Sequence, residues 1–144
     1  MTRPALLVAL VLPLVALLPA AEAAPAPVSS ATVTLKDAPF SFEAKTVRLV
    51  LGRDGTAKVT WKWDTTSMRP HNVEADNKSF NSHPGCAGSV PGLANCGYTQ
   101  LTTYTQTFSK AGTYRYHCAV HGSAGAGMAG TVIVTAPAPL RRTR

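Results

Sequence analysis

Short segments in which apolar and polar residues alternate constrain the fold of this chain more than any other feature. In the clearest of them, Val59, Trp61 and Trp63 are separated by Thr60 and Lys62. Similar segments, or short extended pieces, lie at 31–36, 47–51, 71–73, 102–108, 113–118 and 130–135. Because successive side chains of a strand face opposite sides, each segment predicts a strand with one face on the core.

Turn signals separate these segments, and no stretch has a convincing helical period. Asp54-Gly55 is a hairpin signal, and the region 76–98, which carries several Gly, Pro, Asn and Ser residues, predicts a long irregular connection. The stretch 122–127 is almost all Gly, Ala and Ser, and it predicts a loop. About seven to eight short strands with frequent turns are typical of two antiparallel sheets with Greek-key connections. We therefore predict an all-β, Greek-key β-sandwich.

The first residues predict an export signal. Arg3 precedes an apolar run at 5–18, and the small residues at 21 and 23 fit a cleavage site, so residues 1–23 are interpreted as a secretory signal peptide. The apolar run is short for a membrane span, and an uncleaved N-terminal anchor is the alternative. We expect an exported protein, periplasmic or extracellular at the cell surface, with no integral membrane span after cleavage.

The remaining residues divide into a leader, one domain and a tail. The Ala-, Pro- and Ser-rich stretch 24–30 predicts a flexible leader, 31–135 forms the domain, and 136–144 is a basic tail. The formal net charge is +7, and three of the positive charges lie in this tail. The tail is either solvated or docks on an acidic partner, a membrane or the cell wall. A nucleic-acid partner is not expected without a basic helix, and we expect a monomer.

The chain has three cysteines, an odd number for an exported protein. Cys86 and Cys96 flank the short Gly- and Pro-containing loop 87–95, and we predict that they form a disulfide, which would stabilise the fold by roughly 3 kcal/mol. Two free thiols are the alternative. The remaining thiol is Cys118, which is either a metal ligand or a buried structural cysteine.

Soft and imidazole donors gather around Cys118. His121 follows it by three residues, Met128 lies beyond a glycine-rich stretch, and His71 stands about fifty residues upstream. Two histidines, one cysteine and a weak axial methionine are the ligand set of a blue-copper electron-transfer site. We therefore predict one copper ion per chain, bound by His71, Cys118, His121 and Met128. Asn72, next to His71, is expected to hydrogen-bond the opposite ligand loop.

Other assignments of these residues are possible. Met128 is a ligand or a core-filling residue, and Met68 is a weak candidate ligand. Strand alternation directs His117 to the face opposite Cys118, which makes His117 a poor ligand, and His83 is expected to be exposed in the disulfide loop. A zinc site and a cysteine nucleophile paired with His121 are weaker interpretations, because a thioether is a poor zinc ligand and no oxyanion-stabilising group is evident.

Several motifs resemble those of the cupredoxins, specifically the plastocyanin- and pseudoazurin-like small blue copper proteins. They are Trp61-Lys62-Trp63-Asp64, Pro70-His71-Asn72-Val73, Gly112 to Cys118, His121 and Gly127-Met128-Ala129-Gly130. The resemblance covers about 31–135 and implies a Greek-key sandwich, copper bound by the four residues named above, and one-electron transfer rather than catalysis. In the family the second loop histidine, here His121, reaches the surface through an apolar patch, so a redox partner is expected to dock there.

Two features differ from the plastocyanin pattern. The interval between His121 and Met128 is longer, and His117 replaces the surface tyrosine that often precedes the ligand cysteine. The Cys86–Cys96 loop also looks like an addition. The alternative function is copper binding or delivery without a redox partner.

Overall fold

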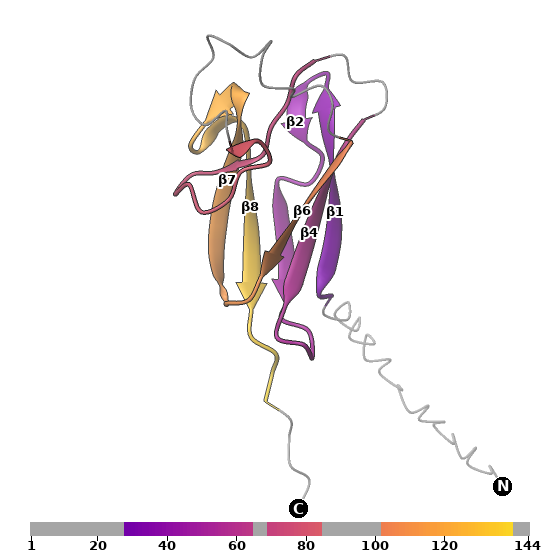
Figure 1. Ribbon diagram of the computed structural model, residues 1–144, viewed down its shortest axis with the longest axis vertical. Coiled ribbons are helices and arrows are strands. Elements are labelled where there is room, and N and C mark those ends of the chain that lie inside the picture. The colour runs from indigo at the N-terminus through magenta and orange to yellow at the C-terminus, as the bar shows by residue number, and fades with distance from the viewer. Residues whose placement is uncertain (1–27, 65–68, 85–101, 140–144) are drawn as a thin grey trace, which may run out of the picture.

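The computed structural model describes residues 28–64, 69–84 and 102–139, which form two packed β-sheets (Figure 1). The strands are β1 (Ser30–Asp37), β2 (Phe40–Phe42), β3 (Thr46–Val50), β4 (Ala57–Trp63), β5 (Glu74–Ala75), β6 (Thr103–Phe108), β7 (Gly112–Ser123) and β8 (Ala126–Thr135). No α-helix occurs in these ranges, so the predicted all-β sandwich is confirmed. The part of the chain that the structure describes also contains no helix with the length and apolarity that a membrane crossing requires.

Some predictions concern residues outside the described ranges. These are the signal peptide, most of the leader, Met68, the Cys86–Cys96 disulfide and the arginines of the tail. The last residues of the predicted leader do lie within the described part. There the Val50 N–H donates to the Val28 carbonyl over 2.9 Å and the Lys58 N–H to the Ser29 carbonyl over 2.9 Å, so ordered pairing starts before residue 31.

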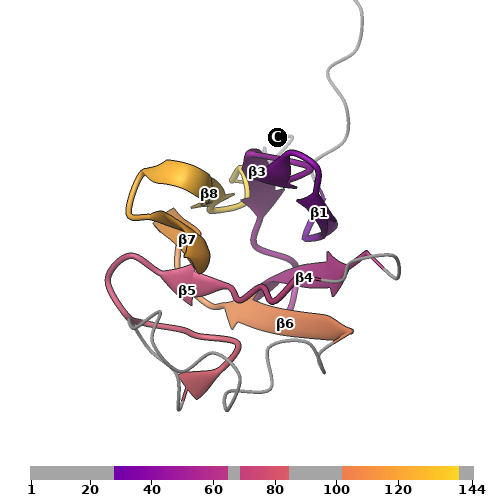
Figure 2. The same cartoon turned by 90° about the horizontal axis from the view of Figure 1, so that it is seen from above.

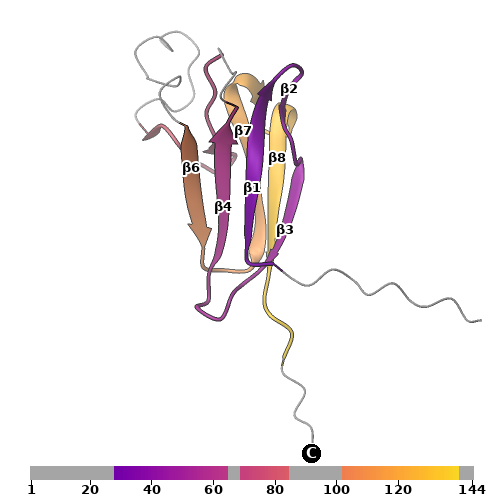
Figure 3. The same cartoon turned by 90° about the vertical axis from the view of Figure 1, so that its right-hand side faces the viewer.

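The strand order is β2-β1-β4-β6 in one sheet and β3-β8-β7-β5 in the other. β1 pairs with β4 in parallel, as β3 does with β8, and the remaining pairs are antiparallel. The prediction of purely antiparallel sheets was therefore wrong, because both sheets are mixed. Alternation reports which face of a strand is buried but not which strand lies beside it. Here β3 crosses to the second sheet before β4 returns beside β1 (Figure 3).

Aromatic residues from both sheets fill the interior. Trp61 of β4 and Tyr116 of β7 are both fully buried, and their rings meet edge to face with centroids 5.0 Å apart. Seen from above, β7 and β5 lie on one side of this interior and β4 and β6 on another (Figure 2). Trp63 and Phe108 are buried and Tyr114 packs against the core, as predicted for the aromatic anchors. Burial of each large side chain contributes about 1.5–3 kcal/mol to folding.

The glycine-rich stretch after Cys118 is not the predicted loop. β7 and β8 continue as a hairpin in which Gly122 pairs with Gly127 and Ser123 with Ala126. Glycine permits this because a Cβ on Gly122 would lie only 2.7 Å from the Met128 backbone nitrogen, closer than real side chains approach. The composition therefore indicates close backbone approach rather than an irregular segment. The short strand β2 was not predicted either.

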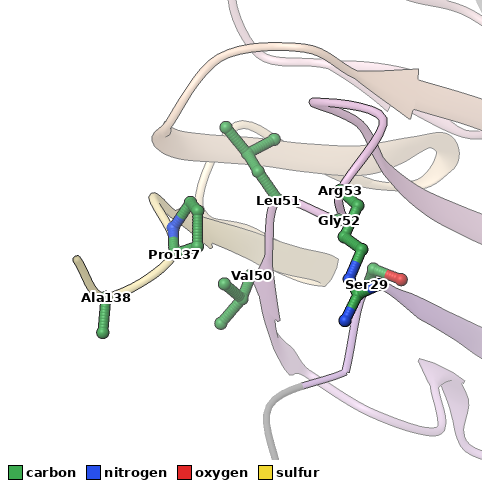
Figure 4. A pocket seen from close by; sticks show the side chains of 7 residues that line it. All are labelled: Ser29, Val50, Leu51, Gly52, Arg53, Pro137 and Ala138. Carbon is green, nitrogen blue, oxygen red and sulfur yellow. The ribbon is translucent and has the colours of Figure 1, made fainter. Parts of the chain in front are cut away.

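The two ends of the sandwich have different roles. The β1–β2 turn and the β7–β8 hairpin lie at the upper end in Figure 1, whereas β1 begins and β8 ends at the lower end. A groove of about 870 Å³ lies at the lower end (Figure 4), lined by Ser29, Val50, Leu51, Gly52, Arg53, Pro137 and Ala138. This lining contains one ionisable side chain, that of Arg53, and no cysteine, histidine or carboxylate. The residues with metal-binding chemistry lie at the other end.

Candidate metal centre

Three predicted ligands meet at the upper end of the sandwich. The Cys118 Sγ lies 3.8 Å from the Nδ1 of His71 and 3.7 Å from the Nδ1 of His121, and the two Nδ1 atoms are 3.2 Å apart. Among the described residues, these form the one group of three or more His, Cys, Asp or Glu side chains with donor atoms within 4.8 Å of one another. His71 and Cys118 are fully buried and His121 is half-buried, so only one of the three side chains reaches solvent.

A bulge in β7 creates this arrangement. The ladder with β8 pairs His117 with Ala129 and then resumes at Gly122 with Gly127. Residues 118–121 of β7 therefore lie opposite the single residue Met128 of β8. A bulge adds residues to one strand and redirects their side chains. Here it brings Cys118 and His121 to the same side as His71, with the buried Met128 across the ladder from them.

A hydrogen bond connects the two ligand-bearing segments. The Ala119 N–H donates to the Oδ1 of Asn72 over 2.7 Å, and Asn72 is fully buried. The predicted contact between Asn72 and the opposite loop is confirmed. Because Asn72 follows His71 and Ala119 follows Cys118, the bond fixes the spacing of these two side chains without any ion.

Two further residues hold the histidines, and sequence reasoning missed both. The Nε2 of His71 lies 2.6 Å from the Oδ1 of Asp37, and the ring of Phe40 stacks on that of His121 with centroids 3.9 Å apart and an interplanar angle of 13°. Asp37 and Phe40 are a cross-strand pair on either side of the Ala38–Pro39 turn between β1 and β2. The one available signal was a carboxylate ending an alternating strand just before a Pro-containing turn. Alternation alone does not reveal that this turn reaches the histidines.

Comparison with known protein families identifies the metal that this kind of centre binds. Residues 29–135 match the copper-binding proteins of the plastocyanin/azurin family. The chain belongs to this family. The match covers most of the chain and includes all eight strands of the described structure, so the sandwich as a whole is a cupredoxin fold.

Solved structures with similar folds include three kinds of copper protein. Oxidised plastocyanin from Dryopteris crassirhizoma is 21% identical, with 73% of this chain and 100% of that chain covered and a TM-score of 0.47. Pseudoazurin from Methylobacterium extorquens AM1 is 23% identical, with coverages of 74% and 75% and a TM-score of 0.39. The copper-containing nitrite reductase of Thermus scotoductus SA-01 is 22% identical, with coverages of 87% and 25% and a TM-score of 0.44.

The donor atoms of this cupredoxin fit a single copper ion. Bonds of about 2.0 Å to nitrogen and about 2.3 Å to sulfur place neighbouring donors about 3.3–3.8 Å apart around a common ion. The two separations from the sulfur, 3.7 and 3.8 Å, fall in this range, and the 3.2 Å separation of the two Nδ1 atoms lies just below it. One thiol, two imidazoles and a nearby thioether suit copper in both of its common oxidation states.

Burial dominates the electrostatics of the cupredoxin site. It raises the pKa of the Cys118 thiol, although the backbone N–H groups of Asn72, Val120 and His121 oppose the shift. Burial also lowers the pKa of His121, and the neighbouring His71 and Arg69 lower it further, whereas Asp37 opposes them. Near pH 7 the metal-free site therefore holds a neutral thiol and a neutral His121 imidazole. A cation that binds the thiolate must release a proton.

The remaining histidines lie outside the three-residue cluster. His117 is buried on the other face of β7, where its Nδ1 lies 2.7 Å from the Oδ1 of Asp76, so its predicted orientation away from Cys118 is confirmed. The prediction that His83 is exposed was wrong. Its side chain is only 9% exposed, its Nδ1 lies 2.8 Å from the Ser82 hydroxyl, and its ring faces Trp63. The Ser82 N–H donates to the Val73 carbonyl, which draws this segment against the sandwich.

Proposed function

We propose that this cupredoxin is a one-electron carrier in which His71, Cys118, His121 and Met128 hold one copper ion. The observation that carries the proposal is the position of the Cys118 sulfur, 3.7–3.8 Å from two imidazole Nδ1 atoms, inside a buried site. When bound, copper supplies a reversible Cu(II)/Cu(I) couple. Met128, buried to 1% exposure opposite the bulge, would be the weak fourth ligand.

The protein's part is to keep the donors in one arrangement during the redox change. Asp37 contacts the His71 ring, and the Asn72–Ala119 hydrogen bond joins the backbone segments that carry His71 and Cys118. Both side chains are shielded from water. A site whose ligands need not move when the charge changes has a small reorganisation energy. The cupredoxin scaffold would therefore favour rapid transfer over binding of a substrate.

His121 is the proposed exit for the electron. It is the half-buried member of the cluster, and the 41%-exposed Phe40 lies flat against it. A redox partner protein would dock over this aromatic face, at the end of the sandwich opposite the groove near Arg53. We further propose that the protein is exported, on the basis of the apolar N-terminal run and the small cleavage-site residues. We also propose that it acts as a monomer.

The visible spectrum of the purified protein with one equivalent of Cu(II), before and after ascorbate, tests this proposal. We expect an intense thiolate-to-copper band that bleaches on reduction and returns on reoxidation. Cys118→Ser should abolish the band, and His117→Gln should leave it intact as a matched control. Bound copper without the band would contradict electron transfer and favour delivery, which a Cu(I) transfer assay to an apo-acceptor would then detect.

We also propose that this chain by itself is not an enzyme. The support is that a single copper site delivers one electron per cycle, and that the four histidines of the whole sequence are too few for the further histidine clusters that multicopper catalysis uses. Since nitrite reductases are among the structures of similar fold, the anaerobic test is addition of nitrite to the reduced protein. We expect no return of the blue band. Reoxidation with release of nitric oxide would contradict the proposal.

A further inference from the structure

We propose that Asp37 is a positioning residue that fixes the tautomer of His71 and lowers the reduction potential of the copper site. The inference rests on the proposed copper-binding function. It is carried by one contact, the 2.6 Å separation between the Asp37 Oδ1 and the His71 Nε2. The His71 ring is completely buried, and the Asp37 side chain is 27% exposed, so the contact lies at the boundary between the site and solvent.

The contact determines which nitrogen of His71 carries hydrogen. A carboxylate is only an acceptor, so the nitrogen 2.6 Å from it must donate, and the hydrogen of the neutral ring is held at Nε2. The Nδ1 lone pair is then directed at the Cys118 sulfur and the His121 Nδ1, where the ion would lie. Without this acceptor the neutral imidazole is free to place its hydrogen on either nitrogen, and the tautomer with hydrogen at Nδ1 cannot bind metal through the atom that faces the site.

The position of Asp37 is built into the fold. It is the last residue of β1 and pairs with Phe40 across the Ala38–Pro39 turn, so both side chains come from one hairpin tip. β1 runs parallel to β4 and ends at the same pole of the sandwich as the bulge in β7. One turn therefore contacts both imidazoles, through the Asp37 carboxylate on His71 and the Phe40 ring on His121.

The carboxylate also changes the electronic balance of the site. A negative charge on the far side of an imidazole raises the basicity of the nitrogen that faces the metal. Such a ligand favours Cu(II) over Cu(I), because the more highly charged ion gains more from it. Reduction adds one electron to the copper and no proton to Asp37 or His71, so the carboxylate opposes the electron directly. Lys36, the residue before Asp37 in β1, forms an ion pair with Asp64 rather than with Asp37, with 3.6 Å between its Nζ and the Asp64 Oδ2.

The test compares two substitutions that remove the same charge. Asp37→Asn keeps an oxygen acceptor of nearly the same size beside His71, and Asp64→Asn removes a carboxylate that belongs to the Lys36 pair. We expect Asp37→Asn to shift the preference toward Cu(I) about tenfold, a rise of about 59 mV for a one-electron couple. Asp64→Asn should give less than a third of that rise. Equal shifts in the two variants would show that only overall charge matters and would overturn the proposal.

A second measurement uses the metal-free protein and does not depend on copper. The nitrogen chemical shifts of His71 report its tautomer, and we expect hydrogen at Nε2 in the wild type and in Asp37→Asn. In Asp37→Ala the acceptor is lost, and both tautomers should be present. An unchanged single tautomer in folded Asp37→Ala would overturn the positioning role. If the wild type lacked the blue band, the proposed function would fail, but this measurement would still decide whether Asp37 orients His71.

Discussion

The ring of Phe40 lies nearly parallel to that of His121, with an interplanar angle of 13° and centroids 3.9 Å apart. The same ring meets His71 edge-on at 6.1 Å, so one exposed aromatic side chain lies over both imidazoles. Phe40 is 41% exposed, so this ring also faces solvent. The relationship makes Phe40 both a cover for the copper site and part of the surface that a partner would touch.

Replacement of Phe40 by Leu should loosen His121 while it keeps an apolar side chain. Aromatic pairs contribute about 0.5–1.5 kcal/mol beyond their buried area, so we expect loss of the stacking on His121 to speed the removal of copper by a factor of about 2–10. The measurement is the rate at which a chelator removes copper from the protein. Val28→Ala, a change at another exposed apolar residue at the far end of the sandwich, is the control and should leave the rate unchanged. Equal rates in wild type and Phe40→Leu would contradict this role.

Replacement of Asn72 by Ala should destabilise the fold even without copper. The change leaves the Ala119 N–H without its acceptor, at a cost of about 1–3 kcal/mol. Urea unfolding of the metal-free protein measures this cost. Asn77→Ala is the matched control, because its Oδ1 accepts from the Ser79 N–H over 3.1 Å in an exposed turn. A loss no larger than that of the control would show that the Asn72 bond does not hold the ligand loop.

Two glycines of the β7–β8 hairpin should respond differently to alanine. Both have positive φ, 74° at Gly125 and 66° at Gly127, which costs about 1–2 kcal/mol for a residue with a side chain. A Cβ on Gly125 meets nothing within 4 Å, whereas one on Gly127 lies 2.7 Å from the His121 carbonyl oxygen. We expect Gly127→Ala to lose a further amount of about 1–3 kcal/mol and to alter the copper spectrum. Chemical denaturation and absorption spectra distinguish the two variants. Identical losses of stability would refute the close approach of Gly127 to the His121 backbone.

Tyr116 should make the protein less stable in alkali. Burial raises its pKa to about 12, and the neighbouring Trp61 side chain opposes the shift. The unfolded chain loses the phenolic proton near pH 10 while the folded chain retains it, so stability is fully present below pH 10 and falls as the pH rises toward 12. Unfolding midpoints at pH 8 and pH 11 measure the loss. Tyr116→Phe should weaken this dependence, and an undiminished dependence in that variant would assign the loss to other groups.

The same substitution should cost little stability at pH 7. The Tyr116 hydroxyl is buried, and within the described residues no hydrogen-bond partner satisfies it. Removal of an unsatisfied buried hydroxyl avoids its desolvation penalty of about 1–3 kcal/mol. We therefore expect Tyr116→Phe to be neutral or stabilising in urea unfolding at this pH. A clear destabilisation would indicate a partner for the hydroxyl.

Much of the fold and of the site can be predicted from patterns within short segments of the sequence. The period-two pattern of β4 identifies the buried positions of Val59, Trp61 and Trp63 because alternation follows from strand geometry, whatever lies next to the strand. The donor types and close spacing of Cys118 and His121 indicate metal chemistry for the same reason. By contrast, the glycines at 122 and 127 were misread, since their composition is the same for a loop and for two backbones in close contact.

The sequence by itself determined most of the strands, their buried faces and the set of thiol, imidazole and thioether donors that we propose as copper ligands. The tertiary structure alone decided that β1 lies parallel to β4 and that the turn after it reaches the histidines. Asp37 contacts His71 across 34 positions of sequence, and Asn72 contacts Ala119 across 47. Such contacts depend on how strands are ordered in the two sheets. Side-chain periodicity within one strand carries no record of that order.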